Sequence, residues 1–452
     1  MSPVTERGIV VLGAGPAGAA VALGLRRLGH AVTVLGVPRA FDAIEGVSDR
    51  VVAGLRGVGI EAALAAIAEP SPRRATWAGA TTALNSERLV DRAAFDRLLW
   101  QELQEHGVEC IAARVLRWQS GEHDKHGEVG HTLQIQRPDE TQPTTLRARF
   151  VVEARGRLAP HPPQGVTRGP ETVALLWRGQ GAAGGKAGSA VESLPGGWAW
   201  CARLPGGAVA LQLTVDPSAI ALPPRAQLGA FVRERLSTVE AALPFLDTAA
   251  TEVHALARTS GAVLAPEVCG ATWLRVGDAA MAADPLSGNG IFQSLSSALQ
   301  APMVVHTLLK HPADAPHARR FHTERVQGLF QRFARIGRDF YAQEQRWAGQ
   351  PFWAARRAWP DAQPAHAAEG DGPPRIEQRP VVDRDRIRLA EALVTADQPL
   401  GIWHVDGVEV APLWRAAQSA PGREVEALAP LLGGSLEKAQ SALRWLRAQG
   451  GL

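Results

Sequence analysis

The chain has 452 residues, of which 46% are hydrophobic, and a formal net charge of +3. A chain of this length holds two or three domains, and a charge this small does not by itself indicate a nucleic-acid partner. There is no apolar run of about 20 residues, as a membrane-spanning helix requires, and the first apolar stretch does not have the form of a signal peptide. The three cysteines are widely separated, which suits a reducing compartment and offers no short-spaced pair of metal ligands. We therefore expect a cytoplasmic globular protein without a metal site, a nucleic-acid partner or a membrane partner.

Residues 9–18, Ile-Val-Val-Leu-Gly-Ala-Gly-Pro-Ala-Gly, predict a strand that turns sharply into a helix. Gly13 permits the turn, Gly15 lets a pyrophosphate approach the backbone, and Gly18 lets the helix pack closely against the strand. The free N–H groups at the start of the helix would face the phosphates. The alternative is a glycine-rich loop in an ordinary α/β fold. We expect a dinucleotide site built from Gly13, Gly15, Pro16, Ala17 and Gly18.

The following elements alternate between helix and strand. Residues 19–28 predict a helix that ends at Gly29, and residues 31–35 predict a second parallel strand. An acidic residue usually ends this strand and binds the ribose. Here Gly36 stands in its place, which leaves Arg39 as the nearest polar substitute. Residues 44–50 are expected to form a loop that contains Ser48, followed by an amphipathic helix to about residue 64.

A second glycine-containing stretch comes late in the chain. Before it, residues 89–107 predict a helix, residues 108–115 a strand, residues 133–136 and 146–152 a hairpin, and residues 171–260 a strand-rich region. Residues 273–278 then predict a strand that runs into Gly277 and Asp278. A proline- and glycine-containing loop leads to a long helix from Ile291. The N-terminus of this helix could stabilise negative charge.

The C-terminal part has a pattern of its own. Residues 312–360 predict helices, and residues 361–380, rich in Pro, Gly, Asp and Glu, predict a linker. Beyond it we expect a helix over 382–396, a short apolar segment at 401–407 and three helical stretches. Ser435 is the expected N-cap of the last helix, 436–448, whose inner face would contain Leu436, Ala439, Leu443 and Leu446. Such a winged-helix-like module could recognise a peptide, bind DNA, or serve only for packing or oligomerisation.

Three stretches of the chain occur in the order and spacing of a known group of enzymes. They are the glycine motif of residues 13–18, the sequence Glu-Ala-Arg-Gly-Arg at 153–157 and the stretch 277–290. Over about residues 7–355 the chain resembles FAD-dependent aromatic monooxygenases of the para-hydroxybenzoate hydroxylase fold and the related flavin-dependent halogenases. The resemblance implies an α/β fold with a Rossmann-like FAD-binding domain, an inserted β-rich substrate domain and a small winged-helix-like α+β domain. The expected boundaries are 1–75, 101–165 and 261–330 for FAD binding, 76–100 and 166–260 for substrate, 331–360 for a helical segment, 361–380 for the linker and 381–452 for the last domain.

The resemblance also implies roles for individual residues. Asp278 would bind the ribityl chain of FAD, and Arg92 would contact FAD from a helix start that is similar to the family's V-D-R-x-x-F-D. The loop after Asp278 would lie beside the isoalloxazine ring. The full expected set for the cofactor is Gly13, Gly15, Pro16, Ala17, Gly18, Arg39, Ser48, Arg92, Val115, Gly277, Asp278, Pro285, Gly288, Asn289 and Gly290.

Catalytic and substrate-binding residues are harder to assign from the sequence. Asp49 and Asp284 are the carboxylates nearest to the flavin-side loops, and each is either a general base or a surface or capping residue. Four tryptophans are expected to line an aromatic pocket or to belong to ordinary core and sheet packing: Trp77, Trp177, Trp198 and Trp200.

The resemblance implies a reaction class. Halogenases of this group use a lysine after the flavin-side loop, but residues 65–100 contain none. Arg73 and Arg74 cannot replace it, because a guanidinium group stays protonated. The sequence therefore favours a monooxygenase of the EC 1.14 type, which uses O₂ to hydroxylate an aromatic ring through a flavin C4a-hydroperoxide. Electrons would come from NAD(P)H or from a separate flavin reductase.

The missing lysine and the additional C-terminal module favour a protein substrate. One group within the halogenase-like flavoproteins hydroxylates a peptidyl tryptophan during tryptophylquinone biogenesis, and the resemblance implies a tryptophan-containing small subunit of quinohemoprotein amine dehydrogenase as the partner. One alternative is a hydroxylase or halogenase of a small aromatic or indole metabolite. The other is a non-enzymatic flavin-binding protein that holds a partner chain.

Overall fold

The structure, a computed structural model, describes residues 5–37, 43–123, 129–181, 184–246, 251–287, 290–365, 373–395, 398–405 and 407–448. The chain forms two compact units. The first unit comprises residues 1–302 and 326–362, and the second comprises residues 303–325 and 363–452.

A seven-stranded sheet forms the nucleotide-binding half of the first unit, with the order β6-β2-β1-β9-β8-β7 and β17 paired with β9. β1 lies parallel to β2 and to β9, whereas β7, β8 and β9 form an antiparallel meander. Residues 9–12 of β1 are buried, as expected for a parallel strand at the centre of a sheet that is covered on both faces. The strands are β1 (Thr5–Leu12), β2 (Val32–Gly36), β6 (Glu109–Ala112), β7 (Arg114–His123), β8 (Val129–Gln136), β9 (Thr144–Glu153) and β17 (Trp273–Arg275).

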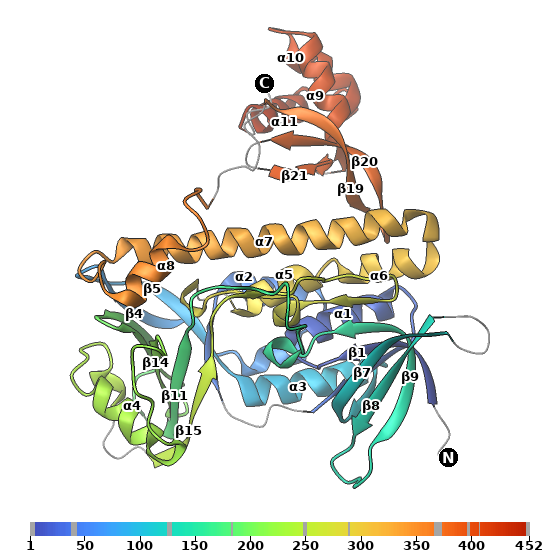
Figure 1. Cartoon of the computed structure of the whole chain (residues 1–452). Coiled ribbons are helices and arrows are strands. Elements are labelled where there is room, and N and C mark those ends of the chain that lie inside the picture. Colours follow the sequence, from blue (N-terminus) through green and yellow to red (C-terminus); the bar gives the residue numbers. More distant parts are fainter. Residues whose placement is uncertain are drawn as a thin grey trace. The chain divides into compact units, whose positions relative to one another are not determined.

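Helices cover this sheet, and α1 packs against α3 and α5 (Figure 1). The expected helix after the glycine motif is confirmed, and Gly29 follows its end with φ +81°. α6 and α7 contain residues of both units. The helices from α1 to α8 are α1 (Pro16–Arg27), α2 (Asp49–Gly57), α3 (Arg92–Glu105), α4 (Leu228–Leu236), α5 (Gly290–Ala298), α6 (Ala301–Lys310), α7 (Ala315–Gln343) and α8 (Pro351–Ala358).

An eight-stranded sheet forms the other half of the first unit, with the order β15-β11-β14-β13-β12-β4-β5-β3. α4 covers one face of it over β11, β14 and β15 (Figure 1), and aromatic residues of α7 and α8 pack on the other face. The strands are β3 (Ile44–Val47), β4 (Ser71–Trp77), β5 (Ala80–Asp91), β11 (Val173–Gln180), β12 (Gly188–Leu194), β13 (Gly197–Arg203), β14 (Ala208–Val215) and β15 (Thr251–Thr259). A three-stranded sheet contains β10 (Thr167–Arg168), β16 (Val263–Leu264) and β18 (Met281–Ala282).

Some local expectations for residues 44–310 were wrong. The loop expected at residues 44–50 begins with β3, because Ile44–Val47 pairs with the distant strand β5. The helix that follows ends at Gly57 rather than near residue 64. The long helix expected from Ile291 is two helices, α5 and α6. Strand pairing across tens of residues is not visible in a local pattern, which explains the first of these errors.

The second unit contains β19 (Arg375–Asp383), β20 (Arg386–Thr395), β21 (Gln398–Ile402), β22 (His404–Val405) and β23 (Val408–Glu409). Three further helices are α9 (Val410–Ser419), α10 (Glu424–Leu428) and α11 (Leu436–Ala448). The helix expected over 382–396 was wrong, since β19 and β20 pair along their whole length as a hairpin. β19 begins at Arg375, inside the stretch expected to be a linker.

The last helix of the second unit is confirmed with the predicted bounds. Ser435 caps it, because its hydroxyl accepts a hydrogen bond from the N–H of Lys438 at 3.3 Å. Ala439, Leu443 and Leu446 are buried in a core shared by α9, α10, α11 and β20, whereas Leu436 is 59% exposed. The inner face is therefore one residue shorter than expected.

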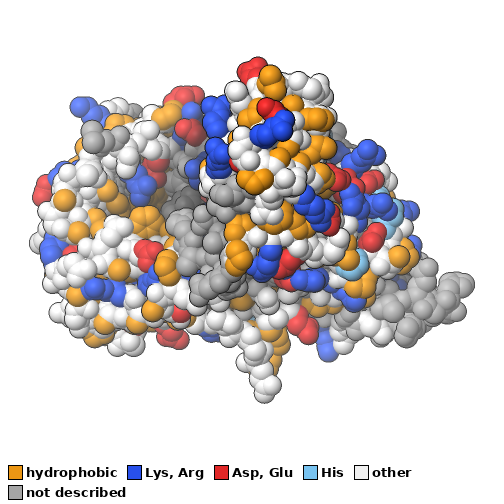
Figure 2. Space-filling model, turned by 90° about the horizontal axis from the view of Figure 1, so that it is seen from above, with side chains coloured by type: hydrophobic (Ala, Val, Ile, Leu, Met, Phe, Trp, Pro, Cys, Tyr) orange, Lys and Arg blue, Asp and Glu red, His pale blue; other side chains and the backbone are white. Residues whose placement is uncertain are grey.

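The surface has no single dominant charge on the face that Figure 2 shows, where basic and acidic side chains are interspersed (Figure 2). Among the described residues, no helix combines the length and the apolar character that a membrane crossing would need.

Candidate active site

The first glycine turn joins β1 to α1. Gly13 adopts φ +107°, and its N–H donates to the carbonyl of Leu35 at 2.7 Å. A Cβ at Gly13 would lie 2.5 Å from the Ala154 oxygen, and a Cβ at Gly18 would lie 2.0 Å from the Gly13 oxygen. Both glycines are therefore required by close backbone packing.

Gly15 has a different environment, since no atom lies within 4 Å of the position that a Cβ would take. It is the N-cap of α1, and no side chain caps this helix or places an acid in its first turn. The N–H groups of the first turn consequently lack side-chain partners and carry the positive end of the helix dipole. The arrangement suits a pyrophosphate in front of Gly15, with Pro16 and Ala17 buried behind it.

The two glycine turns meet. Gly277 has φ +60°, and a Cβ there would lie 2.8 Å from the Cβ of Ala17. Asp278 follows, and its Oδ1 accepts the hydroxyl of Ser294 at 2.8 Å while its Oδ2 lies 3.6 Å from Nε of Arg157. The side chain of Asp278 remains 31% exposed. Burial raises the pKa of this carboxyl group, and Arg157 and Ser294 act in the opposite direction.

Arg92 is the first residue of α3, and its side chain is only 5% exposed. Its guanidinium donates to both carboxylate oxygens of Glu45 at 2.9 Å and to Asp96 at 2.9 Å. Burial acts to lower the pKa of Arg92, because it disfavours the charged form. The two carboxylates outweigh this effect, and the pKa is raised. Within the described residues the Nε of Arg92 has no hydrogen-bond partner. The contact of Arg92 with FAD stays a prediction.

The other residues expected at the cofactor are placed as follows. Val115 lies in β7 rather than at the end of a single strand over 108–115, and its carbonyl accepts a hydrogen bond from Arg155 at 3.3 Å. Ser48 is the N-cap residue of α2. Pro285 begins a short 3-10 turn, and Gly290 begins α5 with no atom near its Cβ position. Three expected residues lie outside the described ones: Arg39, Gly288 and Asn289.

The two candidate carboxylates differ sharply in environment. Asp49 is 82% exposed and forms an ion pair with Arg88 at 2.8 Å. Asp284 accepts the N–H of Leu286 at 2.9 Å and the hydroxyl of Tyr341 at 2.8 Å through the same oxygen. Burial raises the pKa of Asp284, although these two hydrogen bonds lower it. Asp284 is therefore held by hydrogen bonds inside the first unit, whereas Asp49 lies at the surface in an exposed ion pair.

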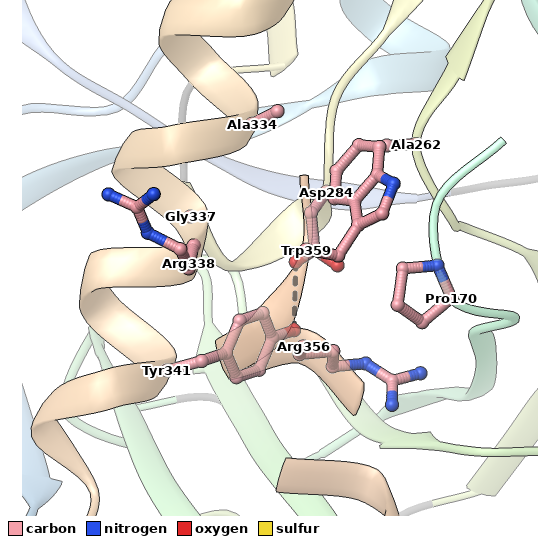
Figure 3. Close-up of a pocket in the computed structure, with 9 residues that line it drawn as sticks. All are labelled: Pro170, Ala262, Asp284, Ala334, Gly337, Arg338, Tyr341, Arg356 and Trp359. Carbon is pink, nitrogen blue, oxygen red and sulfur yellow. Dashed lines mark hydrogen bonds between the residues drawn. The ribbon is translucent and has the colours of Figure 1, made fainter. Parts of the chain in front are cut away.

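Asp284 lines a small pocket, in which Figure 3 shows the Tyr341 hydroxyl directed at its carboxylate (Figure 3). The volume of the cavity is about 10 Å³, which is enough for roughly one water molecule. This pocket is too small for an indole ring. Its lining consists of Pro170, Ala262, Asp284, Ala334, Gly337, Arg338, Tyr341, Arg356 and Trp359.

Three of the four tryptophans belong to one hydrophobic cluster. Trp198 and Trp200 lie on β13 and pack with Trp77 in a cluster that includes residues of α7 and α8. Trp77 donates its Nε1–H to the carbonyl of Phe340 at 3.2 Å, and its ring lies 5.5 Å from that of Trp353.

Trp177 does not belong to this group, which corrects the expectation that all four tryptophans line one pocket. It is 1% exposed and packs in the core beneath α4, with its Nε1–H on Glu252 at 2.8 Å. The register pairs Trp177 with Leu211 and Leu211 with Cys201. Because side chains alternate along a strand, Trp177 shares the face of Cys201, and Trp198 and Trp200 occupy the opposite face.

Sequence analysis did not identify Tyr341, Glu344 and Arg356 as functional candidates. Arg356 is 2% exposed, and its guanidinium donates to the Thr172 hydroxyl at 2.7 Å. The signal available for Tyr341 is its rarity, since it is the single tyrosine of the chain.

Among the described residues, no group of three His, Cys, Asp or Glu side chains is arranged to hold a metal ion.

Comparison with known proteins identifies the fold. Neither a protein-family model nor a curated protein matches the chain. Among solved structures, CmlS, a flavin-dependent halogenase, has a TM-score of 0.74 at 16% identity over 100% of this chain and 96% of its own. The myxobacterial chondrochloren halogenase CndH has a TM-score of 0.61 at 20% identity over 78% of this chain and 86% of its own. These likenesses confirm the expected fold.

A further solved structure is much more similar in sequence. It is the peptidyl tryptophan dihydroxylase QhpG, essential for tryptophylquinone cofactor biogenesis, with a TM-score of 0.84. The identity is 49% over 99% of this chain and 100% of QhpG. With this identity along nearly its whole length, the chain belongs to the peptidyl tryptophan dihydroxylase family of QhpG.

Proposed function

We propose that the chain is a flavoprotein monooxygenase that binds FAD and hydroxylates the indole ring of a tryptophan within a protein, as a step in the maturation of a tryptophylquinone cofactor. The observation that carries this proposal is the 49% identity with a peptidyl tryptophan dihydroxylase over 99% of the chain. The halogenase-like fold supports the choice of a flavin cofactor.

The residues present fit FAD. Gly15 leaves open space before the uncapped N-terminus of α1, where the pyrophosphate would lie. Asp278, partly exposed beside Gly277, would accept hydroxyl groups of the ribityl chain, and the unpartnered Nε of Arg92 supplies a further donor. When bound and reduced, FAD supplies two electrons to O₂, so that one oxygen atom enters the ring and the other leaves as water.

The protein's own residues have three tasks. Trp77 and Trp200 are partly buried members of the cluster that also contains the buried Trp198, and their rings would offer aromatic contacts to an indole ring. Asp284 takes up the proton that the substituted ring carbon loses when aromaticity is restored. The pocket beside Asp284 has room for roughly one water, so the aromatic side chains of α7 and α8 would limit the water that reaches the carboxylate, which strengthens its electrostatic interactions.

The protein substrate we propose is the tryptophan-containing small subunit of quinohemoprotein amine dehydrogenase, and the second unit is the proposed element that contacts it. QhpG, whose substrate is a peptidyl tryptophan, aligns with 99% of the chain, which includes this unit. Electrons for FAD would come from NAD(P)H directly or from a separate flavin reductase.

Mass spectrometry tests the proposal. The full chain is incubated with the small subunit, FAD, NADH and a flavin reductase, and the subunit is then digested and sequenced. Two rounds of hydroxylation, each using one O₂ and two electrons, add about 32 Da to one tryptophan, the mass of two oxygen atoms, and this gain is the expected result. Reactions without FAD and with the Asp284→Asn variant are the controls.

Two outcomes would overturn this choice of substrate. Oxidation of free indole or tryptophan with an unchanged subunit would favour a hydroxylase or halogenase of a small aromatic metabolite. A protein that binds FAD but consumes no O₂ with any substrate would be a non-enzymatic flavin-binding partner.

A further inference from the structure

Tyr341 is the single tyrosine of the chain, and its side chain is 2% exposed. It lies on α7 within an aromatic cluster, where its ring meets those of Phe352 and Trp353 edge-on at centroid distances of 5.9 and 5.8 Å. These contacts hold the ring in one orientation. A phenol oxygen in such surroundings is costly unless it has hydrogen-bond partners, and this one has two.

The direction of these two hydrogen bonds is determined by chemistry. The Nε1–H of Trp198 lies 3.2 Å from the Tyr341 oxygen, and an indole nitrogen can only donate. The phenol oxygen therefore accepts from Trp198, and its own proton is directed to Oδ1 of Asp284 at 2.8 Å. The chain of donors from Trp198 through Tyr341 to Asp284 runs in one direction and ends on the carboxylate.

We propose that Tyr341 is a positioning residue that keeps Asp284 ionised and fixed in orientation, so that Asp284 can accept a proton during hydroxylation. This inference rests on the proposed function. A hydrogen bond donated to a carboxylate favours its charged form, which opposes the effect of burial. The second hydrogen bond to the same oxygen, from the N–H of Leu286, holds the carboxylate against the turn that leads to α5.

Other charged groups also face this pair. Arg356 on α8 and Arg157 act on the carboxyl of Asp284, and Arg338 on α7 lines the same pocket. Figure 3 shows the guanidinium of Arg356 directed away from the Tyr341–Asp284 hydrogen bond, and Asp216 lies 3.9 Å from it. These cations remain when the phenol hydroxyl is removed. The loss of one hydrogen bond to a charged group should then raise the apparent pKa of Asp284 by about one to two pH units.

The first test does not depend on activity. Tyrosine labelled with ¹³C at Cζ gives a single resonance in this chain, because Tyr341 is the only tyrosine. Burial and the charge of Asp284 raise the pKa of Tyr341 well above its ordinary value, so the wild-type resonance should not titrate near pH 10, where an exposed tyrosine does. In Asp284→Asn the resonance should shift and should titrate at lower pH. Asp49→Asn removes an exposed carboxylate and should leave it unchanged.

The second test is the pH dependence of hydroxylation. In Tyr341→Phe the ring contacts remain, and the acid limb of the rate profile should move up by about one to two pH units, with most of the rate recovered at higher pH. Phe352→Leu alters the same aromatic cluster without touching the hydrogen bonds, and its acid limb should stay where the wild-type limb lies.

The outcomes separate the two proposals. An identical ¹³C resonance in wild type and Asp284→Asn would overturn the hydrogen bond and with it the inference. A loss of rate in Tyr341→Phe that is equal at every pH would reduce Tyr341 to a packing role and would also overturn it. If no variant hydroxylates any protein, the proposed function fails, while the resonance still decides whether Tyr341 holds Asp284.

Discussion

Glu344 shows how a single buried charge connects elements of the first unit. Its side chain is completely buried, and it accepts hydrogen bonds from the N–H of Ala78 at 2.9 Å, the hydroxyl of Ser193 at 2.7 Å and the guanidinium of Arg346 at 2.7 Å. Burial acts to raise the pKa of Glu344, but these hydrogen bonds outweigh it and hold the pKa at about 2. The carboxylate therefore joins the turn between β4 and β5 to β12 and to the end of α7.

Replacement of Glu344 by Gln should lower the free energy of unfolding by about 3 kcal/mol at pH 7, because a pKa shift of this size corresponds to that energy. The folded pKa lies below the unfolded value, so the stabilisation is complete above about pH 4.5 and is lost as the pH falls towards 2. Urea unfolding of wild type and variant should consequently differ less at pH 3.5 than at pH 7. Glu69→Gln, at a 93% exposed position, is the control. If wild type and Glu344→Gln differ in the free energy of unfolding by the same amount at both pH values, the stabilisation does not come from the lowered pKa of Glu344.

The glycines of the first turn allow a second prediction at the same scale. Gly18→Ala places a Cβ 2.0 Å from a backbone oxygen and should destabilise the apoprotein by about 1–3 kcal/mol. Gly15→Ala has open space and an ordinary φ of −72°, so the apoprotein should keep its melting temperature. The new methyl group would stand where the pyrophosphate approaches, and the affinity for FAD should fall at least about tenfold, or about 1.4 kcal/mol.

Thermal unfolding without FAD and titration of flavin fluorescence measure these two effects separately. Unchanged FAD affinity in Gly15→Ala would place the pyrophosphate elsewhere.

At the scale of elements, strand alternation and helix amphipathicity decide which side chains meet. Side chains alternate between the two faces of β13, so Trp198 packs against Tyr341 on one face. Ala199 and Cys201 lie on the other face, in the core beneath α4. In α11 the 3.6-residue period buries Ala439, Leu443 and Leu446, while Leu436 at the first turn stays exposed.

Leucines at two positions of α11 should therefore differ in their contribution to stability. Leu443 is 7% exposed and Leu436 is 59% exposed. Leu443→Ala leaves a cavity in the core of the second unit and should cost about 2–5 kcal/mol. Leu436→Ala should change the free energy of unfolding by less than about 0.5 kcal/mol. Calorimetry of both variants measures the difference, and equal melting temperatures would show that this core does not form as described.

At the scale of the whole molecule, each unit has a hydrophobic core of its own. One core of the first unit lies beside the nucleotide turn and contains residues of β1, β8 and β9. The core of the second unit draws on β20 and the helices α9 to α11. The residues proposed to hold FAD all belong to the first unit.

Destabilisation of the second unit should therefore spare the cofactor site. In Leu443→Ala the dissociation constant for FAD should stay within about twofold of the wild-type value, because the altered contacts lie in another core. Conversion of the protein substrate should fall, since the second unit is the proposed contact surface. Flavin titration and peptide mass spectrometry on the same preparation give both values. A parallel loss of FAD binding would show that the two cores are energetically coupled.

The sequence by itself determined the features that depend on neighbours along the chain. The turn at Gly13, the α1 helix that ends before Gly29 and the Ser435 cap of α11 all follow from local backbone chemistry. The order and spacing of the glycine motifs indicated the fold of flavin-dependent monooxygenases and halogenases, whereas the missing lysine and the additional C-terminal module suggested a peptidyl tryptophan as substrate.

Tertiary structure alone decided which distant residues meet. β3 and the β19–β20 hairpin form through pairing with partner strands, which a local pattern of apolar residues does not specify. Asp284 was a candidate on sequence, but only the fold places it beside Tyr341 and, through Tyr341, in line with Trp198. The physical reason is that turns and caps are satisfied by adjacent backbone groups, whereas strand pairing and buried polar contacts depend on groups that folding brings together.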